Sequence, residues 1–336
     1  MKHVAFSSRS GTEMPARVQK QSSSRRSPHS PKTDILGLGA VAVDDLIYVD
    51  QFPTPDSKVQ VRHTARQCGG LTATALVAAA RLGIRCSYAG TVGTDDLSNY
   101  CTQVLKSEGI DLRWLRQTRT ARVFHSRIVV GSHAETRNIF SDGRGVVGAS
   151  PAWPPADVIR SCRVLFLDHV GIRGMWRAAQ IARKARIPIV ADLERDTGPE
   201  FSRLFDFVDH LILSHDFATA RTGDRDPSQS LLQLWNDRRE VVIITGGAQG
   251  CWSIDRENPA KVVHHSAFAV KVADTTGCGD VFHGAYAAAL AEGQPLKDRI
   301  RFASAAAALK ATRHGGQSGI PNRSTLKSFL KKTGFV

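Results

Sequence analysis

The 336-residue sequence predicts an α/β fold, a doubly wound and mainly parallel sheet with a small β-sheet lid. From residue 34 onward, short apolar runs alternate with stretches of helical periodicity. The apolar runs are continuous instead of alternating with polar residues, which is typical of strands buried on both faces. Two further segments interrupt the alternation and have the pattern of paired extended strands.

Six apolar runs are the predicted strands of the main sheet, at residues 34–43, 86–92, 164–170, 187–193, 210–214 and 241–246. Helices are predicted between them, at residues 71–83, 97–109 and 175–186, and a further one at 281–293. Gly83 and Gly109 are expected to end the first two helices, because glycine accepts the left-handed conformation common at helix C-termini.

The two interrupting segments, residues 44–67 and 121–142, are predicted to form the lid. Each is an extended pair, with turns expected at residues 53–57 and 131–134. Together they are expected to lie as a small sheet over one end of the main domain, which spans residues 34–333. A lid of this kind excludes water from a reaction.

Residues 1–33 form a basic, Ser/Arg-rich tail that is predicted to be disordered, since it has no apolar periodicity. It carries seven Lys/Arg against one Glu, and so six of the net charge of +14. A dispensable tail or misassigned start, an organelle transit peptide and a nucleic-acid-binding arm all remain open. The tail lacks the interleaved aromatic residues of such an arm, so nucleic acid is not an expected partner.

Neither a secretory signal nor a membrane span is predicted, because no sufficiently long apolar stretch occurs. The six cysteines are scattered without a CxxC pair, which predicts neither a disulfide framework nor a zinc site. A reducing compartment follows, and a cytoplasmic location is expected.

Residues 274–280 read DTTGCGD and run directly into the predicted helix at 281–293. Glycines let backbone N–H groups converge on an anion, and the N-terminus of a helix favours negative charge. Asp280 lies where an incoming hydroxyl would be. The segment therefore predicts a place where a phosphate is held and an alcohol is deprotonated.

Two nucleotide-binding motifs are excluded. Residues 37–42 fit G-x-G-x-x-A, but that dinucleotide fingerprint must open a helix, and here the chain continues as a strand. The sequence also contains no G-x-x-x-x-G-K-[ST] segment, so a Walker P-loop is absent.

In these motifs and their order, residues 34 to about 330 resemble the ribokinase-like, or PfkB-type, carbohydrate kinases. The DTTGCGD segment is similar to the family's D-T-x-G-A-G-D, with Cys278 in the usual alanine position. The resemblance implies that Asp280 is the catalytic base and that Gly277, Cys278 and Gly279 form the anion hole. Packing in place of alanine is the favoured interpretation of the Cys278 side chain.

The resemblance also implies sugar-binding residues, namely Asp44, Gly69, Gly70, Thr74 and Lys58. Thr74 stands where many members carry Asn, and Ala42 stands where ribokinases carry Asn, which argues against ribose. The narrower likeness is to bacterial ketose kinases of the sulfofructose-kinase type. These kinases have a lysine in the lid at the position that Lys58 occupies in this sequence. Phe140 and Val170 replace the other sulfonate-binding residues of that group, so a ketose is expected without sulfonate specificity.

For cofactors the resemblance implies ATP, Mg²⁺ and a monovalent cation such as K⁺. The implied ATP-binding residues are Thr245, Gly246, Gly247, Gly250 and Thr275, and the implied cation ligands are Asp274, Thr276, Gly316 and Ser318. The family's N-x-x-E motif for magnesium falls on residues 214–217, where neither defining residue is kept.

We therefore expect an ATP-dependent kinase that acts on a primary hydroxyl of a small sugar, with a ketose favoured. A nucleoside kinase of the same fold and a non-catalytic kinase-fold binding protein remain alternatives. The resemblance also implies a homodimer, because lid strands in this family often pair between subunits. Four single residues are also interpreted: Asp45 and Asp50 as solvated lid positions, His283 as packing, and Asp192 as either a site residue or a loop cap.

Overall fold

The structure, a computed structural model, describes residues 33–131 and 136–334. Apart from Thr33, the predicted disordered tail lies outside this range, and so does most of the predicted turn at 131–134. Among the described residues, none of the helices has the length and apolar character needed to cross a membrane.

The main sheet has eight strands in the order β14-β13-β12-β11-β10-β9-β1-β4. Strands β4 to β12 of this order are parallel, and β13 and β14 are antiparallel additions at one edge. The bounds are β1 Thr33–Leu38, β4 Cys86–Tyr88, β9 Cys162–Leu167, β10 Ile189–Asp192, β11 His210–Ser214, β12 Val241–Thr245, β13 Cys251–Asp255 and β14 Val263–His265. This arrangement confirms the predicted doubly wound, mainly parallel sheet.

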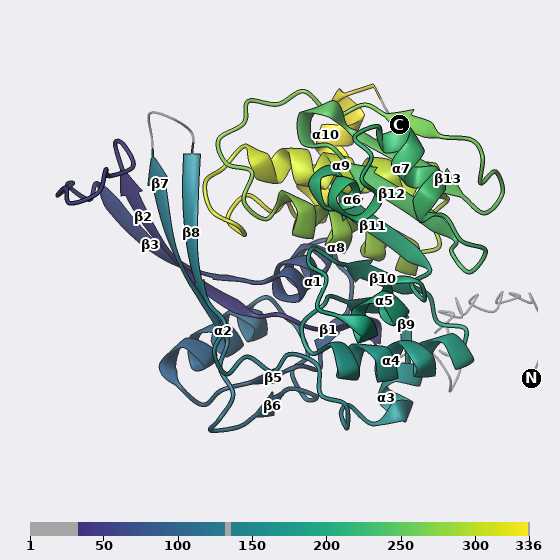
Figure 1. Cartoon of the computed structure of the whole chain (residues 1–336), viewed down its shortest axis with the longest axis horizontal. Coiled ribbons are helices and arrows are strands. Elements are labelled where there is room, and N and C mark those ends of the chain that lie inside the picture. Colours follow the sequence, from purple (N-terminus) through teal and green to yellow (C-terminus); the bar gives the residue numbers. More distant parts are fainter. Residues whose placement is uncertain (1–32, 132–135, 335–336) are drawn as a thin grey trace, which may run out of the picture. The chain divides into compact units, whose positions relative to one another are not determined.

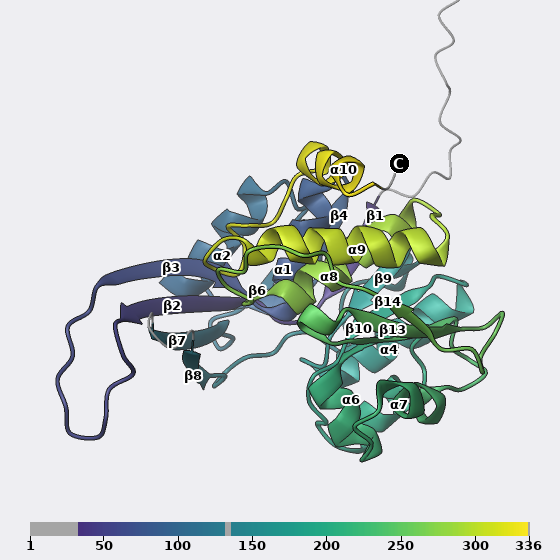
Figure 2. The same ribbon diagram turned by 90° about the horizontal axis from the view of Figure 1, so that it is seen from above.

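Helices cover both faces of the main sheet. One face carries α1 (Leu71–Arg81), α2 (Asp96–Ser107), α8 (Cys278–Ala291), α9 (Leu296–Ala311) and α10 (Arg323–Lys332). The other carries α3 (Ala156–Arg160), α4 (Ile172–Lys184), α5 (Pro199–Phe205), α6 (His215–Thr222) and α7 (Pro227–Leu234). Figure 2 shows α8 and α9 on the opposite side of the sheet from α4, α6 and α7.

The two helix layers explain why the strands are mostly apolar. Along β1, Ile35 joins the core beneath the first helix layer and Leu36 joins the core beneath the second. On β11, likewise, Ile212 joins the core beneath the first helix layer and Leu211 joins the core beneath the second. Successive side chains of a strand point to opposite faces, so a strand covered on both faces is apolar at most of its positions.

The predicted lid is a separate four-stranded sheet in the order β3-β2-β7-β8. Its strands are β2 (Ala42–Val49), β3 (His63–Gly69), β7 (Phe124–Gly131) and β8 (Thr136–Asp142). Both predicted extended pairs are antiparallel hairpins, and β2 joins them by pairing in parallel with β7. Figure 1 shows these strands extending away from the main sheet.

Two predicted strands are each divided by the structure. The run at 34–43 forms β1 of the main sheet and the start of β2 of the lid, and the run at 86–92 forms β4 and β5 (Thr91–Val92), which pairs with β6 (Arg116–Gln117). The first break lies at Gly39, whose φ is 150°. The buried Asp168 holds the crossing, because its carboxylate accepts hydrogen bonds from the Ala40 N–H at 2.6 Å and the Thr72 hydroxyl at 2.8 Å.

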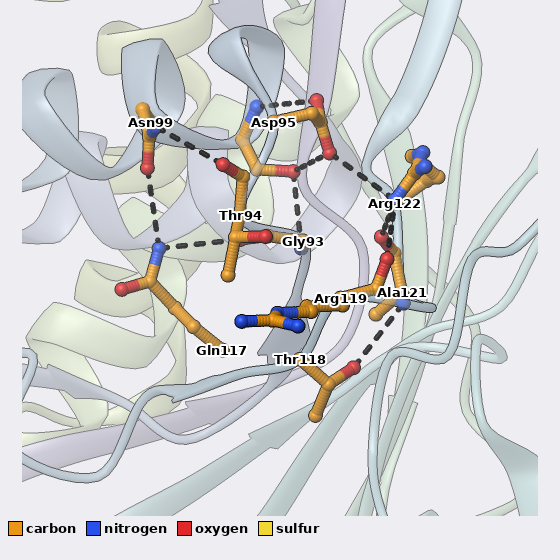
Figure 3. Close-up of polar contacts among 10 residues, drawn as sticks. Gly93, Thr94, Asp95, Asn99, Gln117, Thr118, Arg119, Ala121 and Arg122 are labelled. Atoms are coloured by element: carbon orange, nitrogen blue, oxygen red, sulfur yellow. Dashed lines mark hydrogen bonds and ion pairs between the residues drawn. The ribbon is translucent and has the colours of Figure 1, made fainter.

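The segment that leads into β7 is anchored to the start of α2 by polar contacts (Figure 3). Asp95 caps α2 by accepting a hydrogen bond from the Ser98 N–H, and it lies 3.7 Å from the guanidinium of Arg122. The side-chain amide of Gln117 donates to the Gly93 carbonyl at 3.2 Å. These bonds fix one base of the lid to the main domain.

Helices α1 and α8 cross closely at Gly284, where a Cβ atom would lie 2.1 Å from the Ala75 carbonyl oxygen. Alanine normally stabilises a helix interior by about 1 kcal/mol relative to glycine. Here the added Cβ would meet backbone atoms, and no rotamer change can relieve that clash. The cost of overpacking therefore exceeds the gain in helix propensity. We expect Gly284→Ala to lower the Tm by about 2–6 °C. A melting temperature equal to or above that of the wild type in circular dichroism would contradict this close crossing.

Candidate active site

The turn that precedes α8 has the form expected of an anion site. Gly277 is the N-cap of α8 with φ 75°, and a Cβ there would lie 2.8 Å from the Gly316 carbonyl oxygen. The N–H of Cys278 donates to the Thr275 carbonyl at 3.1 Å, so it is not directed at an anion. Among the described residues, the N–H groups of Gly277 and Gly279 have no acceptor. Of the three residues predicted to form an anion hole, Gly277 and Gly279 are therefore the two whose N–H groups could bind an anion together with the first turn of α8.

Asp280 lies in the first turn of α8 beside the end of strand β10. Its side chain lies close to that of Asp192, which is 3 % exposed. Two ionised carboxylates this close and this buried repel each other, which favours a form that keeps one proton. Burial raises the pKa of Asp280 well above its ordinary range, and the charges of Asp192, Glu194, Asp44 and Asp168 raise it further. Of the two interpretations of Asp192, its position beside Asp280 favours a residue of the candidate site over a loop cap.

His283 follows Asp280 by one turn and is also directed at Asp192. Its Nδ1 lies 3.2 Å from Asp192 Oδ2 and 2.8 Å from the Gly279 carbonyl oxygen, and its Nε2 lies 3.1 Å from the Ile212 carbonyl oxygen. Burial lowers the pKa of His283, while the two carbonyls oppose that shift. The interpretation of His283 as packing was incomplete, because sequence did not show that Asp192 lies against it.

Asp44 and the glycine pair come together at the junction of lid and main domain. Strand β2 pairs with β3 so that Asp44 opposes Gln67, and a Cβ at Gly69 would lie 2.2 Å from Asp44 Oδ2. Gly70 begins α1 with φ 96°, and a Cβ there would lie 2.7 Å from the Ala40 carbonyl oxygen. Both positions therefore require glycine for close approach. Asp44 is in the lid sheet, not at the end of the first strand of the main sheet.

Asp44 is expected to reduce the stability of the free protein at neutral pH. Burial raises its pKa to about 6, whereas an unfolded Asp has a pKa of about 3.9. The native state therefore binds this proton more tightly, and stability falls as the pH rises from about 4 to 6. We expect Asp44→Asn to raise the free energy of unfolding by up to about 2 kcal/mol at pH 8, with the gain vanishing below about pH 4. Urea unfolding at both pH values tests this, and a loss of stability at pH 8 would contradict it.

Asp45 and Asp50 of the lid are paired with basic side chains rather than simply solvated. Asp45 contacts Arg66 at 2.6 Å and His125 at 2.7 Å, and Asp50 contacts Arg62 at 2.5 Å. Lys58 is exposed in the loop between β2 and β3, which extends beyond the ends of both strands (Figure 2). Within the described part of the chain, no hydrogen bond or ion pair connects Lys58 to Asp44 or Asp280.

The loop that follows α9 ties the lid, α1 and the anion turn together. The Gly316 N–H donates to the Gln67 side chain at 2.9 Å, and the Gln317 amide donates to the Thr74 hydroxyl at 3.3 Å. Thr74 is 1 % exposed, so its hydroxyl has a structural partner here. Sequence reasoning had missed both glutamines, because neither belongs to a recognised motif.

The predicted ATP-binding segment is a tight turn at the end of β12. The Gly246 N–H donates to the Gly250 carbonyl at 2.8 Å, Gly247 begins the short 3₁₀ helix Gly247–Gln249, and the Thr245 hydroxyl donates to the Leu213 carbonyl at 3.3 Å. Thr275 is exposed in the anion turn. A cavity of about 400 Å³ adjoins the turn, lined by His215, Arg225, Pro227, Gln249, Trp252 and His264.

The implied metal ions fit the described residues poorly. In residues 33–131 and 136–334, no group of three or more His, Cys, Asp or Glu side chains could hold a metal ion. A magnesium ion would therefore depend on nucleotide oxygens and water. Of the implied monovalent-cation ligands, Asp274, Thr276 and Gly316 lie near one another, but Ser318 is exposed. The Asp274 carbonyl already accepts a hydrogen bond from the Lys310 ammonium at 2.8 Å.

A doubly wound sheet, a β-sheet lid and a glycine turn that opens a helix beside an aspartate are the features expected of the family of carbohydrate kinases that the sequence resembles. The family model described as pfkB family carbohydrate kinase matches residues 32–323, and the chain belongs to this family. The narrower likeness to ketose kinases is not confirmed, since the similar proteins are mostly named ribokinase.

Four similar proteins illustrate the match. Ribokinase from Haemophilus influenzae is 28% identical over 88% of this chain and 97% of its own length. Fructokinase-2 from Solanum habrochaites is 24% identical over 78% of this chain and 87% of its own length. The crystal structure of a putative ribokinase from Agrobacterium tumefaciens has a TM-score of 0.82 and 27% identity, and the match covers 90% of this chain and 98% of that protein. A nucleoside kinase from Methanothermobacter thermautotrophicus is also similar.

Proposed function

We propose that this carbohydrate kinase transfers the γ-phosphoryl group of ATP to a primary hydroxyl of a small sugar, most favourably a ketose, with Asp280 as the base. The observation that carries this proposal is the position of Asp280 in the first turn of α8, next to a glycine turn with unused N–H groups. A base and an anion hole in one turn are what phosphoryl transfer to an alcohol requires.

In the proposed reaction, Asp280 orients the sugar hydroxyl and accepts its proton as the oxygen attacks the γ-phosphorus. The N–H groups of Gly277 and Gly279 stabilise the charge on the transferring group, and the bond to the ADP leaving group breaks. Thr245, Gly246, Gly247, Gly250 and Thr275 are the proposed ATP contacts. Magnesium, when bound with the nucleotide, neutralises phosphate charge. The lid limits competing transfer to water.

Sugar recognition is proposed for Asp44, Gly69 and Gly70, with Thr74 and Lys58 as outer contributors. Asp44 offers a partly buried carboxylate, while Ala42 on the same strand offers no hydrogen-bonding group. Fewer polar partners on β2 support a ketose over ribose, in line with fructokinases among the similar proteins. Exposed apolar lid residues, Val59, Val61, Ile139 and Phe140, support a nucleoside as the second candidate substrate.

The same exposed apolar residues, on a lid with free edges at β3 and β8, also support a homodimer formed through the lid. A strictly monomeric mass in light scattering at working concentration would remove that proposal. We further propose that residues 34–333 form the kinase domain and that the protein is cytoplasmic.

The substrate is tested by measuring ATP consumption against ketoses, ribose, other aldoses, sulfosugars and nucleosides, with the phosphorylated product identified by ³¹P NMR. We expect the highest kcat/KM on a ketose. Highest turnover on ribose or on a nucleoside would replace the ketose assignment. No turnover on any sugar, together with no ATP binding in calorimetry, would contradict the kinase proposal.

A further inference from the structure

Lys310 is a charged side chain that no step of the proposed reaction uses. It lies on α9 and is 0 % exposed. A buried ammonium is costly unless it is paired with an opposite charge or fully hydrogen-bonded. Its partners therefore indicate what the charge does.

The ammonium of Lys310 contacts the first residue of the anion turn. Its Nζ donates a hydrogen bond to the Asp274 carbonyl oxygen at 2.8 Å. Lys310 and Asp274 are thus joined through a main-chain hydrogen bond, and the ammonium also lies near the half-buried Asp274 carboxylate.

This pair lies where two loops of the site meet. The Asp274 carboxylate accepts a hydrogen bond from the Thr276 N–H at 2.8 Å and another from the Gly315 N–H at 2.8 Å. Gly277 and Gly316 are also in close contact across these loops. The loops are therefore held by one carboxylate whose charge is balanced from within the protein.

We propose that the Lys310 ammonium acts as a built-in monovalent cation, which holds the anion turn in place so that this enzyme works without added potassium. A second cation beside the ammonium would be repelled, and the Asp274 carbonyl that would bind it is already in use. Lys310 is a positioning residue, since it acts on the turn through Asp274. The kinetic part of this inference rests on the proposed kinase function.

The test compares KCl with choline chloride at equal ionic strength, in kcat/KM and in the Tm. For the wild type we expect neither quantity to change. Lys310→Ala removes the ammonium and leaves space for a small ion, so in choline chloride we expect kcat/KM to fall about tenfold or more and the Tm to fall by about 6 °C or more. Adding KCl or NH₄Cl should restore part of the lost kcat/KM and part of the lost Tm, and both effects should saturate as the salt concentration rises.

Lys297→Ala is the matched control, because Lys297 lies on the same helix but is exposed. It should behave as the wild type in both salts. A wild-type kcat/KM or Tm that rises selectively with KCl would overturn the proposal even if Lys310→Ala fails to fold. A folded Lys310→Ala that shows no selective response to K⁺ or NH₄⁺ would overturn it too. If no sugar is phosphorylated, the proposed function fails while the Tm comparison still decides the role of Lys310.

Discussion

Replacing Asp280 by asparagine is expected to lower kcat by about 10²–10⁴-fold, the usual contribution of general base catalysis. The amide keeps the shape of the side chain and can hydrogen-bond with Asp192, but it cannot accept the proton of a sugar hydroxyl. The fold should persist, because the substitution removes one of the crowded carboxyls whose charges raise each other's pKa. ATP binding in calorimetry should change by only a few-fold.

Asp298→Asn is the matched control, because Asp298 also lies in the first turn of a helix, on α9, but is exposed. It should leave kcat and Tm unchanged. An Asp280→Asn enzyme with near-normal kcat would place the base elsewhere, and Asp192 would be the next residue to test.

Replacing His283 by phenylalanine is expected to shift the acidic limb of the pH profile of kcat/KM upward by about one to two units. His283 Nδ1 lies 3.2 Å from Asp192 Oδ2 and is in position to stabilise the anionic form of that carboxyl. His283 Nδ1 hydrogen-bonds the Gly279 carbonyl, so its effect on Asp192 is a close electrostatic contact, and one pKa unit of such an effect corresponds to about 1.4 kcal/mol. Without it, the Asp192–Asp280 pair retains its proton to higher pH, so Asp280 is available as a base only at higher pH.

His210→Phe is the control for the cost of changing a buried histidine. His210 is 3 % exposed on β11, and its Nδ1 lies 3.0 Å from the Tyr286 hydroxyl rather than from a carboxylate. It should lower the Tm without moving the pH profile. If His283→Phe does not fold, the smaller His283→Asn should show the same shift. Equal loss of rate at every pH would mean that His283 only supports packing.

The pH profile matters because several carboxyls gather around Asp280, the proposed base. Burial raises the pKa of Asp168 to about 6, as it does for Asp44. Asp168 holds the crossing from β1 into the lid, and Asp44 is the proposed sugar contact. Deprotonation of these groups therefore adds negative charge beside the lid and the proposed base, and binding of a sugar at Asp44 should alter the measured pKa values.

Local patterns in the sequence were sufficient for the fold class and for the anion turn. Continuous apolar runs predict strands with both faces covered, because a strand can be apolar at every position only when helices lie on both sides. The two extended pairs predict the lid for the same reason, since turn residues and extended patterns act within a few positions of each other. Residues 274–280 predict the anion turn because a glycine turn and the helix it opens are contiguous.

The boundary between the two sheets could not be predicted in the same way. After Asp34 the run at 34–43 is apolar, and its two glycines, Gly37 and Gly39, do not by themselves show which one marks the point where the chain leaves the main sheet. That point is fixed by Asp168, which lies 128 residues away from Ala40 and accepts its N–H. The mistaken single strand arose because a distant carboxylate, not the local sequence, ends β1.

The sequence alone thus determined which elements form and where a phosphate and a base can meet, because those features depend on neighbouring residues. Tertiary structure alone decided the pairing of Asp192 with Asp280 and His283, and that of Lys310 with Asp274. Each pairing depends on the order of strands in the sheet and on the helix that packs against it. Buried charges must find partners where the chain folds back on itself, and that position is a property of the whole packing arrangement.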